Sequence, residues 1–287
     1  MTTPPIQWYP GHIAKAERDL KEQLKLVDVV LEVRDARIPL ATQHPQVSQW
    51  LGSKNRVLVI NRLDMISAEI RQLWKSWFET QGEKVFFTNA QKGVGVEAIA
   101  KAAQAAGVEV NQRRRDRGML PRPVRAAVIG FPNVGKSALI NRLLKRRVVE
   151  SAARPGVTRQ LKWVRISDEI ELLDAPGVIP LKLEDQENAI KLAICDDIGD
   201  GAYDKQRVAV ALIELLTYLE ATSEGLVCLD KLRKRYYIEP TAMSSEDYLE
   251  NLSQRQFQGN IDRASRQILT DFRKLFFGLI PLELPPK

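Results

Sequence analysis

Apolar residues follow two alternating patterns along the first part of the chain. Short continuous runs predict strands that are buried on both faces of a sheet, and they lie at 27–35, 56–61, 84–89, 124–130, 161–166 and 170–174. Longer stretches carry their apolar residues on one side of a helix, and they lie at 11–25, 67–80, 93–106 and 137–146. Strands that alternate with helices predict an α/β fold, a mostly parallel sheet with helices on both faces.

This alternation ends near residue 184. The remaining sequence contains no predicted strand, and its helical stretches lie at 184–196, 204–221, 224–235, 244–256 and 260–277. We therefore predict an α/β domain over residues 1–180, beginning with a helical arm at 1–25, and a small all-helical domain over 184–287. Residues 107–123 combine charge with Gly and Pro and predict a basic linker inside the first domain.

Charge separates the two predicted domains more clearly than composition does. The chain has 287 residues, of which 44% are hydrophobic, and its 2 cysteines are too few for a disulfide framework. Residues 1–180 carry 29 basic and 18 acidic side chains, a net charge of +11. Residues 181–287 carry 14 basic and 18 acidic side chains, a net charge of −4, so the whole chain has a net charge of +7. The basic first domain favours a polyanionic partner. Because no run of eighteen apolar residues occurs, we expect a cytoplasmic protein without a membrane span.

The segment GFPNVGKS (130–137) matches the pattern G-x-x-x-x-G-K-[ST] between a predicted strand and a predicted helix. Gly130 and Gly135 allow the backbone to turn its N–H groups toward phosphate oxygens. Lys136 supplies a positive charge to the β- and γ-phosphates, and the Ser137 hydroxyl is a ligand for Mg²⁺. This segment predicts a phosphate-binding loop for a nucleoside triphosphate.

Two further segments supply other groups of such a site. DAPG (174–177) follows the predicted strand 170–174 and has the form D-x-x-G. Asp174 is expected to hold Mg²⁺ through a water molecule, and the Gly177 N–H to meet the γ-phosphate. Thr158, between the phosphate loop and DAPG, is the candidate for a second hydroxyl ligand of Mg²⁺.

Two segments at the ends of earlier strands predict a pocket for guanine. NRLD (61–64) ends the strand 56–61, and the Asp64 carboxylate can accept from both N1–H and N2–H₂ of guanine, which adenine does not offer. TNA (88–90) ends the next strand, and the Ala90 N–H is the candidate donor to guanine O6. Taken together, these segments indicate GTP rather than ATP.

The order of the segments is unusual, because in Ras-like GTPases the phosphate loop comes first and the guanine segments last. Here the guanine segments precede the phosphate loop, and residues 107–123 would join the former ends of the domain. The chain resembles the circularly permuted GTPases, and within them the YlqF family of ribosome biogenesis GTPases. The resemblance extends over essentially the whole chain and is carried by IQWYPGHIAKA (6–16), DARIP (35–39), NRLD, GFPNVGKS, PGVT (155–158) and DAPG.

The resemblance implies a circularly permuted P-loop GTPase domain and a GTPase that binds the large ribosomal subunit and its rRNA late in assembly. GTP and GDP would be substrate and product, with Mg²⁺ and K⁺ as ions, and we expect a monomer with no DNA or membrane partner. The implied GTP-binding residues are Asn61, Arg62, Leu63, Asp64, Asn89, Ala90, Asn133, Val134, Gly135, Lys136, Ser137, Ala138 and Gly177. The implied catalytic residues are His12, Lys136, Thr158 and Gly177, and the implied metal ligands are Ser137, Thr158 and Asp174 for Mg²⁺ and Asn133 for K⁺.

The sequence departs from the usual GTPase pattern in four ways. Arg62 stands where the family usually has Lys, and its plane can still stack over the base. Ala138 stands where Thr is common, so a contact to the α-phosphate there comes from the backbone alone. Thr88-Asn89 is a loose version of the final guanine segment. Val178 stands where Ras-like enzymes have the Gln that orients the attacking water.

The missing Gln leaves the catalytic group open. His12 is the family's candidate for orienting the attacking water, and the alternatives are an ordinary helix residue or a contact to rRNA. Asn133 is either a K⁺ ligand or an asparagine that stabilises its loop, and His44 is interpreted as a loop residue. The basic runs 113–117, 145–147 and 231–235 are candidates for RNA phosphate contacts.

Two other functions remain open from the sequence. One is an RNA-binding module whose nucleotide switch is nearly inactive, which the absence of a Gln after DAPG allows. The other is a small-molecule phosphotransferase built on the same phosphate loop, although no lid or second substrate site is evident.

Overall fold

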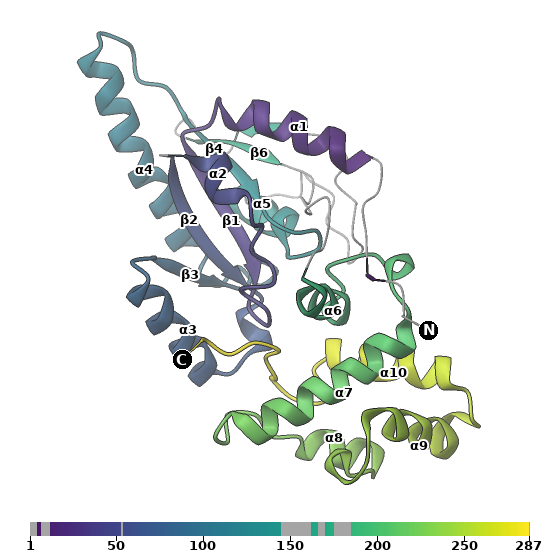
Figure 1. Cartoon of the computed structure of the whole chain (residues 1–287). Helices are drawn as coiled ribbons and strands as arrows, with labels where there is room; N and C mark the ends of the chain where they lie inside the picture. The colour runs from purple at the N-terminus through teal and green to yellow at the C-terminus, as the bar shows by residue number, and fades with distance from the viewer. Residues whose placement is uncertain are drawn as a thin grey trace.

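A six-stranded sheet in the order β3-β2-β1-β4-β6-β5 forms the centre of the first domain (Figure 1). The computed structural model describes residues 5–6, 12–52, 54–144, 162–165, 170–174 and 185–286, but not the side chains of 12–17, 162 and 174. The strands are β1 (Val29–Asp35), β2 (Asn55–Asn61), β3 (Val85–Thr88), β4 (Val124–Ile129), β5 (Lys162–Arg165) and β6 (Ile170–Asp174). All pair in parallel except β5, which is antiparallel to β6. The predicted strands and the mostly parallel sheet are confirmed.

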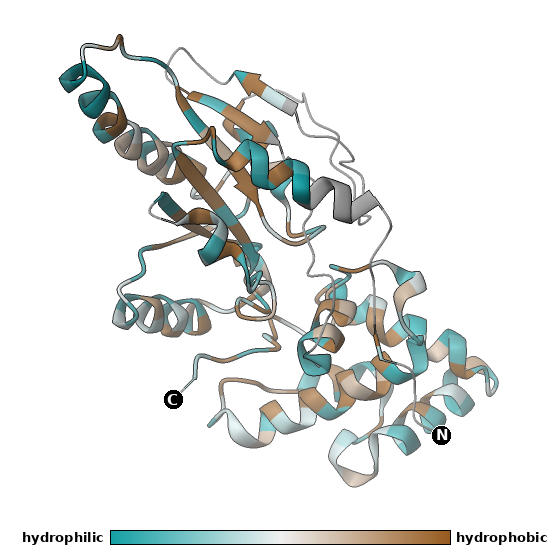
Figure 2. Ribbon diagram, turned by 45° about the horizontal axis from the view of Figure 1, so that its top comes forward, coloured by the Kyte–Doolittle hydropathy of each residue, from teal (hydrophilic) through white to brown (hydrophobic). Residues whose placement is uncertain are grey.

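Helices cover both faces of this sheet because its strands are apolar on both sides. Along β1, Val29, Leu31 and Val33 belong to the cluster that α4 (Val96–Asp116) and α5 (Lys136–Leu143) complete. The intervening Val30 belongs to a second cluster, on the opposite face. That face is covered by α1 (His12–Leu24), α2 (Val47–Leu51) and α3 (Ala68–Thr80), which complete two clusters there. Figure 2 shows the strands as strongly hydrophobic segments.

The predicted linker 107–123 is wrong for its first ten residues, because residues 107–116 continue α4. Gly107 suggested a break, but it allows α4 to approach β4, since a Cβ there would lie 1.8 Å from Val124 Cγ2. The helix ends at Asp116, and left-handed Gly118 (φ 70°) turns the chain back toward β4. Only residues 117–123 connect the two elements without helix.

The C-terminal part is helical, as predicted. Its helices are α6 (Gln186–Ile194), α7 (Lys205–Thr222), α8 (Asp230–Tyr236), α9 (Ser245–Phe257) and α10 (Ile261–Arg273). Two predicted helices are too long. Left-handed Glu224 and Gly225 delay the start of α8, and left-handed Leu275 and Gly278 follow the end of α10.

The two predicted domains are joined by shared packing and by the end of the chain. One hydrophobic cluster contains Val33 of β1 together with Ile194 and Leu216 of the helical part. The segment after α10 lies against the first domain, where the Leu282 N–H donates to the Arg37 carbonyl oxygen at 2.9 Å. The buried Glu283 carboxylate accepts the Leu40 N–H at 2.7 Å. Among the described residues, no helix has the length and apolar character that crossing a membrane requires.

Candidate nucleotide-binding site

The loops that follow β2, β3 and β4 meet at the carboxyl edge of the sheet, where the Asn61 side chain joins them. Asn61 is the last residue of β2 and is buried. Its Nδ2 donates to the Val134 carbonyl oxygen at 2.8 Å, and its Oδ1 accepts the Ala90 N–H at 3.0 Å. The structure therefore brings NRLD, TNA and GFPNVGKS together. It also gives the Ala90 N–H a partner in Asn61, which differs from its expected contact with guanine.

The phosphate loop depends on glycine at two positions. Gly130 has φ 148°, and a Cβ there would lie 2.2 Å from the Val33 carbonyl oxygen. Gly135 has φ 101°, and a Cβ there would lie 2.1 Å from Asn61 Nδ2. Asn133 is also left-handed, with φ 58°. A loop bent in this way before a helix N-terminus is a nest that accepts anions such as phosphate.

Lys136 and Ser137 begin α5 directly after this loop. The Lys136 side chain is buried, and its Nζ donates to the Phe131 carbonyl oxygen at 2.8 Å, which keeps the ammonium group over the loop. Ser137 and Ala138 lie in the first turn of α5, where the helix dipole favours a negative charge. Val134 and Ala138 pack against the core, so they offer only backbone groups to a phosphate.

The guanine side of the site is more open. Asp64 lies in a 3₁₀ turn, Leu63–Met65, where its side chain is 37% exposed and its Oδ2 is 3.5 Å from Lys92 Nζ. Asn89 Oδ1 accepts the Lys92 N–H at 2.9 Å, so this asparagine shapes the loop. Arg142 of α5 donates to the carbonyl oxygen of Ala90 at 3.4 Å. A carboxylate at the rim of a fixed loop suits a donor-rich edge such as that of guanine.

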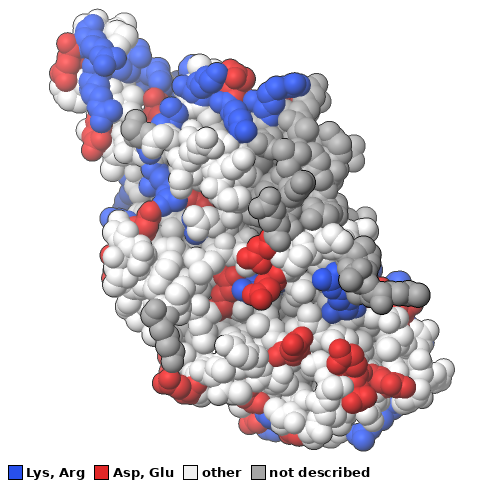
Figure 3. All heavy atoms as spheres, in the orientation of Figure 1, with Lys and Arg blue, Asp and Glu red and all other residues white. Residues whose placement is uncertain are grey.

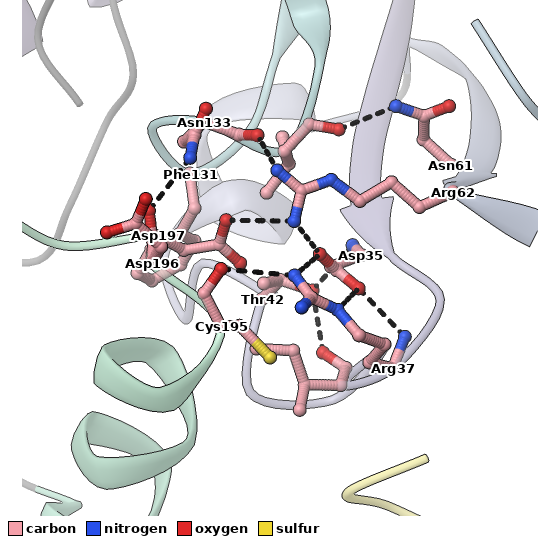
Figure 4. A network of polar contacts seen from close by, with 12 residues as sticks. Asp35, Arg37, Thr42, Asn61, Arg62, Phe131, Asn133, Cys195, Asp196 and Asp197 are labelled. Atoms are coloured by element: carbon pink, nitrogen blue, oxygen red, sulfur yellow. Dashed lines mark hydrogen bonds and ion pairs between the residues drawn. The ribbon is translucent and has the colours of Figure 1, made fainter. Parts of the chain in front are cut away.

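The Arg62 guanidinium is held by other residues of the protein. Its Nη1 donates to Asp35 Oδ2 at 2.6 Å, and its Nη2 donates to the Asn133 carbonyl oxygen (Figure 4). The rigid fork of a guanidinium can hold two such acceptors at once. Arg62 therefore ties the guanine-side loop to the phosphate loop.

The Asp35 carboxylate is the centre of this arrangement. It is fully buried, and it accepts the Arg37 backbone N–H at 2.8 Å and Arg37 Nη2 at 2.8 Å, in addition to Arg62. Burial by itself raises the pKa of Asp35, but the charges of Arg37 and Arg62 outweigh it and hold the pKa at about 2. Asp35 is therefore ionised at neutral pH, and it fixes both guanidinium groups.

The loop after α6 brings the helical part to the same place. Arg37 Nη2 donates to the Cys195 carbonyl oxygen at 3.1 Å, and Asn133 Nδ2 donates to the Asp196 carbonyl oxygen at 2.9 Å. Asp197 is fully buried 3.7 Å from Arg62 Nη1, and its oxygens accept no hydrogen bond from the described residues. Burial raises the pKa of Asp197 to about 7. We name this set the junction network, made up of Asp35, Arg37, Arg62, Asn133 and residues 195–197.

For several predicted site residues, the structure describes only the backbone or neither backbone nor side chain. Thr158 and Gly177, like Val178, are outside the described residues. Asp174 ends β6, where its backbone pairs with Val128 of β4, so it lies at the same edge as the phosphate loop, and its side chain is not described. His12 is the first residue of α1, and its side chain is likewise not described.

His44 lies in a loop, as interpreted from the sequence, but it is buried. Its ring centroid is 4.4 Å from that of Trp50 and 6.3 Å from that of Phe131 in the phosphate loop. Burial lowers the pKa of His44 to about 4. His44 is therefore a neutral packing residue behind the phosphate loop.

Sequence reasoning missed most of the junction network. Asp35 and Arg37 belong to DARIP, a segment that contributed to the family resemblance but was not assigned to the site. Two opposite charges directly after a buried strand could have indicated a buried ion pair. Asp196 and Asp197 follow an amphipathic helix, where acidic residues are usually solvated, so no local signal marks them. Asp197 is buried and Asp196 partly buried, beside the phosphate loop, which precedes them by about 60 residues.

Comparisons with known proteins agree with this geometry. A family model described as 50S ribosome-binding GTPase matches residues 125–230. Ribosome biogenesis GTPase A of Bacillus pumilus is 34% identical over 98% of this chain and 99% of its own length. The protein of that name from Bacillus cereus is 40% identical over 74% of this chain and 71% of its own length. A crystal structure of GNP-bound YlqF from T. maritima superposes with a TM-score of 0.63 at 23% identity, covering 95% of this chain and 99% of that chain.

The phosphate loop, the guanine loops and the sheet order together define a P-loop GTPase whose guanine segments precede its phosphate loop. The chain belongs to the ribosome biogenesis GTPase A family, and it is accordingly a GTPase. The structural likeness to YlqF shows that the two proteins share the same fold, including the helical C-terminal part.

Proposed function

We propose that this GTPase is an assembly factor that binds the large ribosomal subunit late in its maturation, and that its nucleotide state switches its binding to rRNA. The names of its relatives and the description of the matching family model support a role at the ribosome. The observation that carries the switching part is the junction network, since it joins the phosphate loop to the helical part through Asn133 and residues 195–197.

In this proposal, the nucleotide binds to residues at the carboxyl edge of the sheet. The phosphate loop and Lys136 bind the phosphates, and Asp64 binds the guanine edge. Ser137 lies in the first turn of α5, directly after the phosphate loop. Its hydroxyl oxygen is the kind of ligand that Mg²⁺ prefers, so it fits the ion. Thr158 and Asp174 complete that set in this proposal. Mg²⁺ would neutralise charge on the phosphates, and K⁺ near Asn133 would add to this.

Hydrolysis needs a group that orients the attacking water, since Val178 cannot. We assign this to His12, whose imidazole can accept a proton near neutral pH. His12 begins the N-terminal helix α1, and in this proposal the ribosomal subunit would hold it over the γ-phosphate. Hydrolysis would then be slow for the protein alone and faster on the subunit. His12→Ala would depress stimulated turnover by roughly 10²–10⁴-fold and leave GTP affinity unchanged.

The switch follows from linkage. The phosphate loop contacts the helical part, so a nucleotide that moves this loop changes how the helical part is held. A difference in subunit affinity between nucleotide states must appear as an equal difference in nucleotide affinity on the subunit, typically ~5–150-fold.

The test is sedimentation of the protein with purified large subunits in a non-hydrolysable GTP analogue and in GDP. We expect tighter binding in the analogue, by a factor equal to the increase, on the subunit, in the ratio of analogue affinity to GDP affinity. Equal binding in both nucleotides contradicts the switch, and no binding in either contradicts the ribosomal role. Turnover in K⁺ and in Na⁺, with and without subunits, tests the potassium and stimulation parts. Negligible turnover under all conditions would leave an RNA-binding module with an inactive switch.

A further inference from the structure

The segment 107–123, which we name the α4 arm, projects from the sheet on the side opposite the nucleotide loops (Figure 1). The arm ends where β4 begins, and the phosphate loop starts where β4 ends. The two therefore lie at opposite ends of one strand. No residue of the arm takes part in the nucleotide site or in the junction network.

Polar contacts fasten the arm into one conformation. The Asn111 side chain pairs with the Arg122 backbone, because its Nδ2 donates to the carbonyl oxygen at 3.0 Å and its Oδ1 accepts the N–H at 3.1 Å. The Arg122 guanidinium donates to both Asp28 oxygens at 2.7 and 2.9 Å. Arg114 Nε donates to the Leu120 carbonyl oxygen at 3.1 Å. A surface fixed in this way loses little conformational entropy when it binds.

The exposed end of the arm carries unneutralised positive charge. Arg113 faces Glu109 at 3.6 Å, and the Asp116 carboxylate accepts from Gln112. The guanidinium groups of Arg115 and Arg117 have no hydrogen-bond or ion-pair partner in the described part of the chain, and both side chains are exposed. Figure 3 shows basic side chains gathered at the end of α4 and along α1. This charge favours a ligand with phosphates.

A cleft of about 400 Å³ lies between α4 and the returning segment, lined in part by Val108, Asn111, Arg115, Pro121 and Arg122. Gly107 contributes no side chain to it, because none fits against Val124. The cleft places apolar surface beside the Arg115 guanidinium, and Val108 is 64% exposed there. Its volume is in the range of small-ligand sites, ~300–1,000 Å³, so it can admit a single nucleotide.

We propose that the α4 arm is an RNA-binding element that takes one unpaired nucleotide in this cleft. The base packs against Val108 and Pro121, and Arg115 and Arg117 contact the flanking phosphates. RNA is favoured over an acidic protein because arginine both pairs with phosphate and stacks on bases. The inference rests on the proposed function, since rRNA on the large subunit would supply the nucleotide.

The test compares the parent with Arg115→Ala/Arg117→Ala in two assays. One measures binding to purified large subunits in a GTP analogue, and the other measures binding to a fluorescein-labelled single-stranded RNA of mixed sequence. Loss of two phosphate contacts weakens binding roughly 10-fold and lowers the salt dependence by ~1.4 in log–log slope for the single strand. Val108→Ala weakens binding about 3-fold with the slope unchanged, because it removes only apolar contact.

The matched control is Arg71→Ala/Lys75→Ala on α3, which removes the same two charges from the same domain and leaves the arm intact. Equal losses in the arm and control variants would reduce the effect to net charge and overturn the proposal. Loss of subunit binding with unchanged binding of the labelled RNA would assign the arm to a ribosomal protein and also overturn it. If the parent fails to bind subunits, the proposed function is wrong, while the labelled RNA still tests the arm.

Discussion

Arginine has opposite roles at the two ends of the sheet. At the carboxyl edge, Arg37 is fully buried and Arg62 largely so, and both are held by Asp35 in the junction network. At the amino edge, Arg115 and Arg117 lie exposed on the α4 arm, without a partner in the described structure. A buried guanidinium must be matched by nearby acceptors, because leaving it unpaired is strongly unfavourable. An exposed one keeps its donors available for a ligand. Net charge alone therefore says little about which arginines bind a partner.

The strongest way to break this comparison is to remove Lys136, a buried cation that is assigned to the ligand. Lys136→Ala should weaken GTP binding by roughly 10²–10³-fold, since the phosphates lose a buried, hydrogen-bonded positive charge. The measurement is equilibrium titration with a fluorescent GTP analogue. Arg115→Ala is the control, and it should leave this affinity unchanged. An equal loss of GTP affinity in both variants would mean that the net positive charge of the protein, and not the position of Lys136, determines the affinity.

Base recognition gives the next largest effect. Asp64→Asn should weaken GTP binding roughly 10–100-fold, because guanine N1–H and N2–H₂ lose a charged acceptor. The variant should gain affinity for xanthosine triphosphate, whose edge is complementary to an amide. Competition titrations with both nucleotides measure the ratio. Unchanged preference for GTP would remove Asp64 from the guanine pocket.

The buried acid of the junction network makes stability depend on pH. The pKa of Asp197 is raised to about 7, so the folded protein holds a proton that the unfolded chain releases near pH 4. This contribution stabilises the fold at low pH and is lost as pH rises from about 4 toward 7, on the order of 4 kcal/mol for a shift of about three pKa units. Asp197→Asn should therefore be more stable than the parent at pH 8 and equal to it near pH 4, measured by urea unfolding. A variant that is less stable at pH 8 would show that attraction by Arg62 outweighs burial.

The smallest expected effect comes from replacing an arginine of the junction network with lysine. Arg62→Lys keeps the charge, but an ammonium group cannot hold both Asp35 and the Asn133 carbonyl oxygen in a fixed fork. We expect a loss of about 1 kcal/mol in the free energy of unfolding and a few-fold weaker GTP binding. Arg71→Lys on α3 is the control and should change neither. Identical behaviour of the two variants would leave Arg62 without a bridging role.

Most of the fold could be predicted from local pattern. Each predicted strand is present because continuous apolar runs such as 27–35 are stable only between two layers of helices. The two kinds of error have different causes. Gly107 suggested a break, but the close contact of α4 with Val124 requires glycine there. Helix 224–235 was predicted too long for a local reason, because Glu224 and Gly225 adopt left-handed backbone conformations.

The nucleotide site shows the same division. Motif spacing placed GFPNVGKS, NRLD and TNA at strand ends, and parallel strands bring such ends to one edge. Side-chain direction was not contained in that spacing. Arg62 was expected over a base and lies in the junction network, and the Ala90 N–H was expected at guanine and donates to Asn61.

The sequence by itself determined the order of the elements, the phosphate loop, the guanine segments and the basic character of the first domain, because each depends on residues close together in the chain. Only the tertiary structure decided which charges are buried and which are free. Burial of Asp197 requires the phosphate loop to pack on the loop after α6, and exposure of Arg115 requires α4 to extend beyond the sheet. Both depend on contacts between distant segments, and the energy of a charge depends on the surroundings that those contacts create.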